Sequence, residues 1–126
     1  MEIPENLRYS RDHEWVSVAG DIVTVGITDY AQDALGDVVF VEIPRIGTSV
    51  SRGERVTEVE STKSVSEIYA PVTGEVVEVN EQLSDAPETL NSDPYGSGWL
   101  FRVRVTDAVE LDELLSADDY QSILEG

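Results

Sequence analysis

The pattern of hydrophobic and polar positions predicts many short β-strands. Residues 15–18 and 22–27 are rich in β-branched side chains, and the Ala-Gly-Asp segment between them is typical of a turn, so we expect a β-hairpin there. A short apolar run bounded by turn residues is the usual mark of a strand. Further stretches of this kind lie at 38–41, 55–60, 65–69 and 75–79.

Two other features of the pattern indicate how strands are covered. Residues 99–105 alternate, with Phe101, Val103 and Val105 on one face and arginines on the other, which indicates a strand with one buried face. Residues 38–41, Val-Val-Phe-Val, are continuously apolar. We therefore expect both faces of that strand to be covered by other parts of the chain.

Helices are predicted only at the periphery. Thr28 can cap a short helix that ends at Gly36. Thr106 and Ser116 can cap two helical segments near the C-terminus, and polar residues 80–98 suit a loop with one helical turn. The apolar face of the first helix consists of Tyr30, Ala31, Ala34 and Leu35.

Composition agrees with a folded domain and narrows its partners. The chain has 126 residues, of which 40% are hydrophobic, enough to bury a core. With the strand pattern, this predicts one mainly β domain over residues 1–126, a β-sandwich or flattened barrel with short peripheral and C-terminal helices. Eight basic residues against 26 acidic ones give a net charge of −18. Nucleic acids and anionic membranes are bound through Lys and Arg, so we expect neither as a partner.

Residues that the chain lacks exclude several chemistries. It has no apolar run of the roughly 20 residues that span a membrane and no signal-peptide pattern, so we expect a soluble, cytoplasmic protein. It has no cysteine and one histidine, His13, so we expect no metal site. It also lacks a phosphate-binding glycine loop and a nucleophile motif, so nothing indicates an enzyme.

The scarcity of lysine is the most informative feature of the composition. Seven of the eight basic residues are arginine, and Lys63 is the only lysine. A surface rich in acids and poor in lysine suits concentrated salt, where the Debye length falls to about 3 Å at 1 M and carboxylate repulsion is screened. We therefore expect a halophilic source. Under that pressure Lys63 is either a remnant or a residue whose amine cannot be replaced.

The position of Lys63 bears on that choice. It lies between the predicted strands at 55–60 and 65–69, among small hydroxylated residues that suit a tight exposed turn. A lysine at a hairpin tip is accessible to a modifying enzyme, and its amine is a nucleophile that arginine cannot imitate. Modification of Lys63 and an ordinary surface lysine both remain open on these grounds.

The sequence around Lys63 resembles the lipoyl-lysine hairpin of the glycine cleavage system H protein family. Residues 60–63, Glu-Ser-Thr-Lys, and the run that follows from 66 to 80 carry this resemblance. It extends over nearly the whole chain, because further blocks match the family in the same order. These blocks are Tyr9 with residues 12–16, and residues 26–32, 35–41, 91–96 and 98–100.

The resemblance implies a carrier rather than an enzyme. It implies a lipoyl-type β-sandwich, a barrel-sandwich hybrid, with lipoic acid joined by an amide to Lys63. In the family, a pyridoxal-phosphate glycine decarboxylase loads an aminomethyl group onto the reduced lipoyl sulfur. A tetrahydrofolate-dependent aminomethyltransferase then removes it, and dihydrolipoyl dehydrogenase reoxidises the dithiol. A lipoylating enzyme would be a fourth partner.

A loaded arm would need shelter from water, and a cationic amine is best held by a carboxylate. We expect Glu14 and Glu67 to take this role, with Asp12 as a third candidate; the alternative is that all three belong to a general acidic coat. The matching block around His13 favours a packed or hydrogen-bonded histidine over a ligand. Aromatic residues expected in the core are Trp15, Phe40 and Trp99.

Other functions compete with this interpretation. One rival is a different swinging-arm domain, from a 2-oxoacid dehydrogenase or a biotin carboxylase, but biotin sites usually flank the lysine with methionine and Met1 is the only methionine here. A second is an unmodified acidic β-domain that serves as an interaction module. A third is an H-like protein that relays lipoyl groups to other acceptors.

Overall fold

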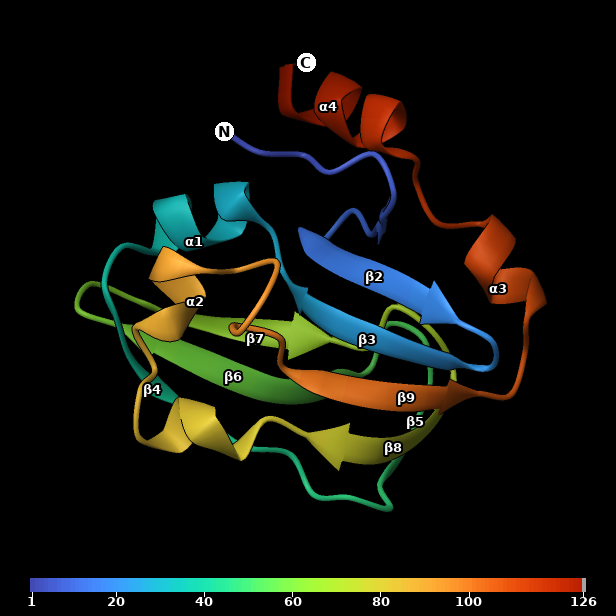
Figure 1. The fold of residues 1–126 in the computed structure, drawn as a ribbon, viewed down its shortest axis with the longest axis horizontal. Coiled ribbons are helices and arrows are strands. Elements are labelled where there is room, and N and C mark those ends of the chain that lie inside the picture. The colour runs from blue at the N-terminus through green and yellow to red at the C-terminus, as the bar shows by residue number, and fades with distance from the viewer. Residues whose placement is uncertain (126) are drawn as a thin grey trace.

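The computed structural model describes residues 1–125 and contains two antiparallel β-sheets with short helices around them (Figure 1). The larger sheet has the strand order β1-β2-β3-β9-β8-β5, and the smaller one has the order β4-β6-β7. The mainly β sandwich expected from the sequence is confirmed, and the two sheets stay separate rather than closing into one barrel. The strands are β1 Arg8–Tyr9, β2 Glu14–Ala19, β3 Ile22–Ile27, β4 Val38–Val41, β5 Ser49–Val50, β6 Arg55–Ser61, β7 Val65–Tyr69, β8 Gly74–Val79 and β9 Phe101–Val105.

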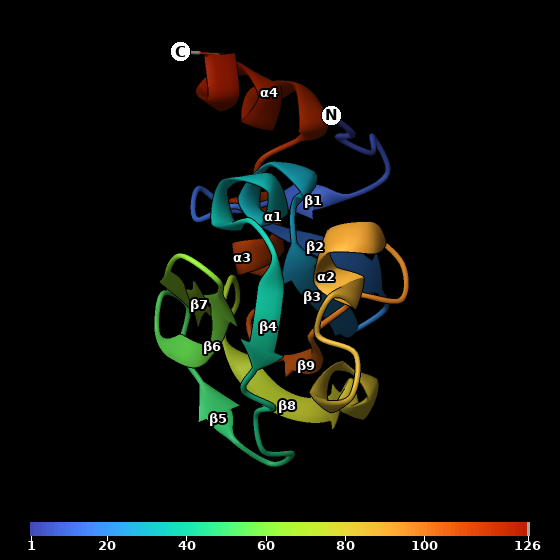
Figure 2. The same ribbon diagram turned by 90° about the vertical axis from the view of Figure 1, so that its left-hand side faces the viewer.

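The helices lie at the margins of the sheets (Figures 1 and 2). None of them in the described part of the chain is long and apolar enough to cross a membrane. The C-terminal segment is joined to β1, because Tyr9 and Leu115 exchange backbone hydrogen bonds of 2.9 and 2.7 Å. The helices are α1 Asp29–Leu35, the 3₁₀ turn η1 Glu81–Ser84, α2 Thr89–Ser92, α3 Val109–Asp112 and α4 Ala117–Glu125.

The first hairpin and the helix after it form as predicted. β2 pairs with β3 across a turn at Gly20, whose positive φ of 68° suits glycine. Thr28 caps α1 by accepting a hydrogen bond from the N–H of Ala31 (3.2 Å), and the helix ends at Gly36 with φ 83°. These two features fix the direction in which the chain enters the smaller sheet.

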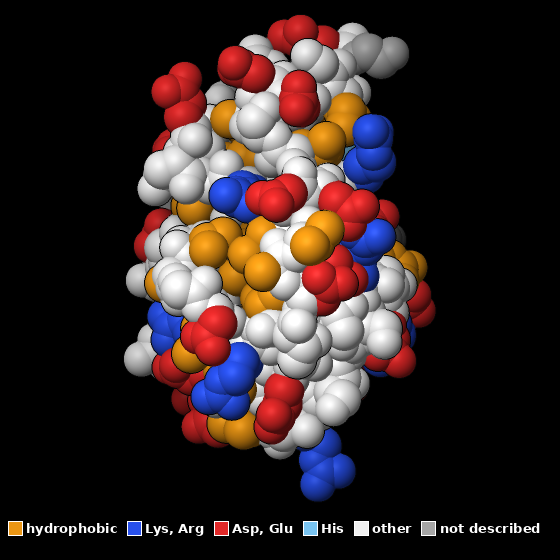
Figure 3. Space-filling model, turned by 90° about the vertical axis from the view of Figure 1, so that its right-hand side faces the viewer, with side chains coloured by type: hydrophobic (Ala, Val, Ile, Leu, Met, Phe, Trp, Pro, Cys, Tyr) orange, Lys and Arg blue, Asp and Glu red, His pale blue; other side chains and the backbone are white. Residues whose placement is uncertain are grey.

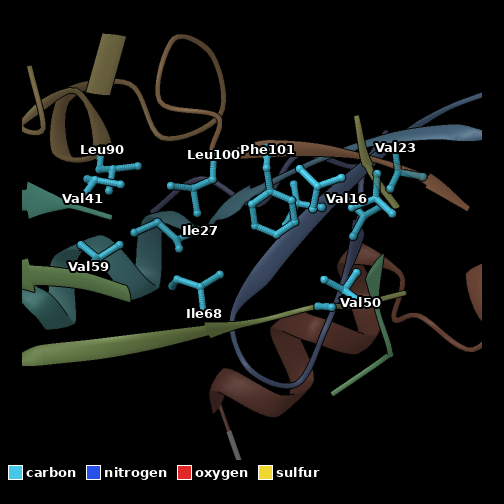
Figure 4. Close-up of a cluster of buried hydrophobic side chains, with 14 of the residues drawn as sticks. Val16, Val23, Ile27, Val41, Val50, Val59, Ile68, Leu90, Leu100 and Phe101 are labelled. Atoms are coloured by element: carbon cyan, nitrogen blue, oxygen red, sulfur yellow. The ribbon is translucent and has the colours of Figure 1, made fainter. Parts of the chain in front are cut away.

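The core fills the space between the two sheets (Figure 4). Val59 and Ile68 project from the smaller sheet toward Ile27 and Phe101 of the larger one, while Leu90 of α2 covers the end of the core near β4. The side chains of these residues are almost fully buried. Because both strands of the β6–β7 hairpin contribute to this core, the body of the hairpin is firmly held while its tip extends beyond the core.

The continuously apolar run at 38–41 is not covered on both faces, contrary to expectation. Val38 and Val41 are buried, but Val39 and Phe40 remain 54% and 50% exposed. The pairing with β6 shifts by one residue between Val38 and Phe40, so Val39 is the extra residue of a β-bulge. The prediction that Phe40 belongs to the core is therefore wrong.

Two details near the C-terminal half also differ from the predictions. Residues 80–98 contain two short helical segments, η1 and α2, rather than one. Thr106 does not cap α3, because its hydroxyl donates to the carbonyl of Thr73 instead. Ser116 does cap α4 as expected, since its Oγ accepts from the N–H of Asp119 (3.1 Å).

Candidate functional site

Lys63 lies at the tip of the β6–β7 hairpin, in a turn held together by one side chain. The Oγ of Ser61 accepts hydrogen bonds from the backbone N–H groups of Lys63 (3.2 Å) and Ser64 (3.0 Å). The backbone N–H of Ser61 also donates to the carbonyl of Ser64 (2.8 Å). The side chain of Ser61 thus supports the turn, in which no residue adopts the positive φ that favours glycine. The expected hairpin tip is confirmed, with Lys63 exposed to solvent.

The turn rests against the connection between α1 and β4. The N–H of Thr62 donates to the carbonyl of Asp37 (3.0 Å), so the two segments are linked through the backbone. The Cε of Lys63 lies only 3.1 Å from the point that a Cβ on Gly36 would occupy. Gly36 therefore suits the positive φ of this position, and it also leaves space that the flexible lysine stem occupies. Within residues 1–125, Lys63 forms no ion pair with a carboxylate.

A cleft of about 280 Å³ lies beside the hairpin, between β7 and α1. One wall is the apolar face of α1 that the sequence predicts, and the opposite wall is the start of β7. Because this cleft begins one residue after Lys63, an acyl chain attached to the lysine could lie in it. Its walls are formed, in chain order, by Asp12, His13, Tyr30, Ala31, Ala34, Leu35, Ser64, Val65 and Ser66.

His13 closes one end of this cleft in a strained backbone conformation. Its φ is 68°, which is uncommon for a residue with a side chain. The ring packs on Tyr30 with centroids 4.7 Å apart, and its Nδ1 lies 2.8 Å from the hydroxyl of Tyr120 in α4. The same hydroxyl is 2.8 Å from the Oγ1 of Thr28. Burial lowers the pKa of His13, although Asp12 opposes the shift. The prediction of a packed, hydrogen-bonded histidine is confirmed.

Glu14 is buried between the two sheets rather than exposed in an acidic coat. Only 1% of its surface is accessible. Its Oε1 accepts from the hydroxyl of Ser10 and its Oε2 from the backbone N–H of Tyr69, each at 2.8 Å. Burial raises the pKa of Glu14 to about 8, against the opposing effect of these two hydrogen bonds. The side chain therefore connects the start of β2 to the end of β7.

The other two predicted carboxylates occupy different positions. Asp12 lines both the cleft next to Lys63 and a second hollow of about 360 Å³ that contains Glu14. Glu67 is exposed and accepts from the hydroxyl of Tyr69 (3.0 Å), with Arg55 at 3.8 Å. The structure therefore brings Asp12 and Glu14 together, while Glu67 lines neither hollow.

Several residues of the site escaped the sequence analysis. Ser10 and Tyr120 hold Glu14 and His13, but Tyr120 lies 107 residues from its histidine partner and no sequence pattern links them. Ser61 belongs to the matching block before Lys63, and its position two residues ahead of the lysine could have suggested a side-chain-supported turn. No group of three or more potential metal ligands occurs among residues 1–125.

Comparisons with known proteins show the family to which the chain belongs. The family model described as glycine cleavage H-protein matches residues 7–126. A glycine cleavage system H protein of Thermus thermophilus is 58% identical over 125 residues, covering 99% of this chain and 98% of that one. That of Carboxydothermus hydrogenoformans is 51% identical over 123 residues, covering 98% and 95%.

A solved structure supports the same assignment. The crystal structure of a glycine cleavage system H protein from Mycobacterium marinum superposes with a TM-score of 0.90 at 46% identity, covering 98% of this chain and 99% of that one. On the family model, the relatives and the fold together, this chain belongs to the glycine cleavage H-protein family.

Proposed function

We propose that this protein is the lipoyl-lysine carrier of the glycine cleavage system, with lipoic acid joined by an amide to Lys63. The observation that carries the proposal is the setting of the only lysine in the chain. Lys63 is exposed at the tip of a supported turn, free of ion pairs within the described residues, beside a cleft with one apolar wall. Membership of the H-protein family agrees with this role.

The residues around Lys63 suit a lipoyl group. Amide formation would remove the lysine charge, so no buried or paired cation would be disrupted. The apolar wall formed by α1 suits the alkyl chain, and the hydroxyls of Ser64 and Ser66 on the other wall suit the amide. When attached, the dithiolane would supply the reversible thiol and disulfide chemistry that accepts a one-carbon unit.

The chain's own residues would hold and orient rather than react. We propose glycine decarboxylase, aminomethyltransferase, dihydrolipoyl dehydrogenase and a lipoylating enzyme as partners, each supplying its own chemistry. Lys63 anchors the arm, the Ser61-supported turn fixes where the arm begins, and Gly36 leaves room for the lysine stem to lie flat. Residues 1–126 would act as a single carrier domain, since the core takes side chains from both sheets.

We propose that Asp12 and Glu14 hold the amine of the cargo. Asp12 lies at the wall shared by the two hollows and Glu14 lies deeper, with a carboxyl whose pKa is raised to about 8. A cationic amine beside Glu14 would favour the ionised carboxylate and form a charge-assisted hydrogen bond. Glu67 is the weaker candidate, because it is exposed and lines neither hollow.

The composition supports one further part of the proposal. The chain has 26 acidic and 8 basic residues, and every basic residue except Lys63 is arginine. This composition suits a protein that works in concentrated salt. Under that pressure, the retention of Lys63 is explained if its amine is the attachment point.

The decisive experiment compares wild type with Lys63→Arg. Wild type incubated with a lipoylating enzyme should gain one lipoyl mass increment and should then support CO₂ release from glycine by glycine decarboxylase. Lys63→Arg should melt at the same temperature and do neither, because the guanidinium keeps the charge but is not a nucleophile. A lipoylated wild type that fails to support glycine decarboxylation would favour a lipoyl relay. If wild type cannot be lipoylated, the alternative of an unmodified interaction module would be favoured instead.

A further inference from the structure

The β-bulge in β4 places two large apolar side chains on the solvent side of the smaller sheet. Val38 and Val41 point into the core, and Val39 and Phe40 between them both face outward, so the alternation of a regular strand is broken. Bulges are often found where a sheet edge must redirect a side chain. Contiguous exposed apolar side chains are typical of interaction surfaces, so this pair in so acidic a chain points to a binding surface if further apolar residues adjoin it.

These side chains belong to the end of the molecule that carries Lys63. Phe40 pairs with Glu60 of β6, which in turn pairs with Val65 of β7, so the three side chains form one row across the outer face of the sheet. Val65 is 56% exposed and follows Lys63 by two residues. Figure 2 shows β4 in front with the β6–β7 hairpin beside it and α1 above. Val39, the unpaired bulge residue next to Phe40, is exposed as well. We use the name apolar row for the three exposed apolar residues of this surface, Val39, Phe40 and Val65.

The charges around the apolar row are predominantly acidic. Glu42, Glu58 and Glu67 surround Arg55 at 2.9, 2.8 and 3.8 Å, so three carboxylates share one cation. Glu60 lies within the row without an ion pair in the described residues. At the opposite end of the molecule, acidic and basic side chains are interleaved around a central apolar group (Figure 3). A partner for the apolar row would therefore present apolar side chains bordered by Lys or Arg.

We propose that the apolar row is the docking surface for the enzyme that acylates Lys63. This inference rests on the proposed function and specifies one partner of that site. In the acylation step, the neutral amine of Lys63 attacks the acyl carbon of lipoyl adenylate; an amide bond forms, the acyl–phosphate bond breaks, AMP leaves, and the nitrogen gives up a proton. The lysine must enter the partner's active centre for this to occur.

The reach of the lysine selects this partner over the others. An acylating enzyme acts on the end of a four-carbon stem, so its surface must come close to the hairpin backbone. The backbone next to the turn is that of Asp37, the residue just before β4, because its carbonyl accepts from the N–H of Thr62, and the apolar row begins two residues later. An enzyme that acts on the far end of a lipoyl arm can work from a greater distance and needs less of this contact.

The test measures acylation of the unmodified protein by a lysine-lipoylating enzyme supplied with lipoyl adenylate, followed by intact mass. Phe40→Ser and the double variant Val39→Thr/Phe40→Ser should lower kcat/KM at least tenfold through KM, with kcat nearly unchanged. Val65→Thr, on a different strand, should lower it three- to tenfold. The matched control is Val109→Thr, because Val109 is 65% exposed on α3 at the other end of the molecule; its rate should stay within twofold.

Several outcomes would overturn the proposal. Folded Phe40→Ser and Val65→Thr variants that are acylated at the wild-type rate would do so. Prolonged incubation should fully lipoylate Phe40→Ser, and this loaded form should support glycine decarboxylation as well as wild type; an equal loss in that reaction would assign the row to the decarboxylase instead. A wild-type dimer that Phe40→Ser converts to a monomer would assign the row to self-association. Failure of wild type itself to be acylated would refute the proposed function, a distinct result.

Discussion

The two central hairpins, β2–β3 and β6–β7, have similar lengths but are built for different purposes. β2 and β3 pair over six residues without a shift, across a turn that uses the positive φ of Gly20. β6 and β7 pair with a register shift, and their turn depends on the hydroxyl of Ser61. The first hairpin lies inside the larger sheet, between β1 and β9, while the second presents Lys63 to solvent. The first turn thus relies on the backbone conformation of a glycine, and the second is reinforced by the hydroxyl of Ser61 in addition to its backbone hydrogen bond.

The two hairpins also differ in packing, which is rigid around the first and adaptable around the second. Trp15 lies directly across Gly26 in the first hairpin, and a Cβ on Gly26 would come within 2.6 Å of three atoms of its indole ring. For Gly36, beside the second hairpin, the three atoms nearest to the position of a Cβ all belong to the flexible side chain of Lys63. One glycine therefore fixes a rigid aromatic side chain, and the other accommodates a side chain that has to move.

The largest expected effect comes from breaking the first hairpin. Gly26→Ala should destabilise the protein by about 3 kcal/mol, because the indole of Trp15 is buried and cannot move away freely. Chemical denaturation with tryptophan fluorescence measures this. Gly36→Ala gives the comparison on the other side, where the lysine stem can yield but the positive φ still costs free energy. A change below about 1 kcal/mol for Gly26→Ala would contradict the rigid packing.

The second prediction concerns the residue that joins the two hairpins. Glu14 begins β2, and its carboxylate accepts from Tyr69 at the end of β7. Its pKa is raised to about 8 in the folded protein, so the folded state binds the proton more tightly than the unfolded state does. The stabilisation from this group is complete below about pH 4.5 and is lost as the pH rises through 8.

Glu14→Gln should remove this pH dependence. We expect the free energy of unfolding of wild type to fall by about 2 kcal/mol more than that of the variant between about pH 5 and pH 8.5. Denaturant titrations at both pH values measure the difference, and comparison of the two proteins cancels the contribution of the other acidic residues. Parallel curves for the two proteins would show that Glu14 ionises normally.

The sequence predicts those features of the two hairpins that leave a local pattern, and it does not predict those that depend on tertiary contacts. Strand positions follow from β-branched runs, and 65–69 is predicted with the observed bounds. Lys63 stands out because every other basic residue is arginine. Exposure of Phe40 was not predicted, because a continuous apolar run has no period that reveals a bulge. Burial of Glu14 was not predictable either, since one acid among 26 is distinguished only by tertiary contacts.

The third prediction concerns the difference in charge between the two hairpins. The outer face of β6–β7 carries Arg55 with three glutamates, whereas the body of β2–β3 is almost free of charge. With a net charge of −18, screening of repulsion between carboxylates should outweigh the weakening of these ion pairs. The melting temperature should rise by about 5 °C, roughly 1 kcal/mol, from low ionic strength to molar KCl. A flat or falling midpoint would remove the explanation of the composition by high salt.

The smallest expected effect tests the turn itself. Ser61→Ala removes the hydroxyl that accepts from the N–H groups of Lys63 and Ser64, and because the turn is exposed, water can replace it. We expect a loss of only about 0.5–1 kcal/mol in stability. Acylation of Lys63 should also slow, with a two- to fivefold fall in kcat/KM, because the backbone that carries the lysine would be less ordered. Ser17→Ala in β2 is the matched control, and it should leave acylation unchanged. Equal acylation rates for the two variants would mean that the hydroxyl only closes the turn and does not help to present the lysine.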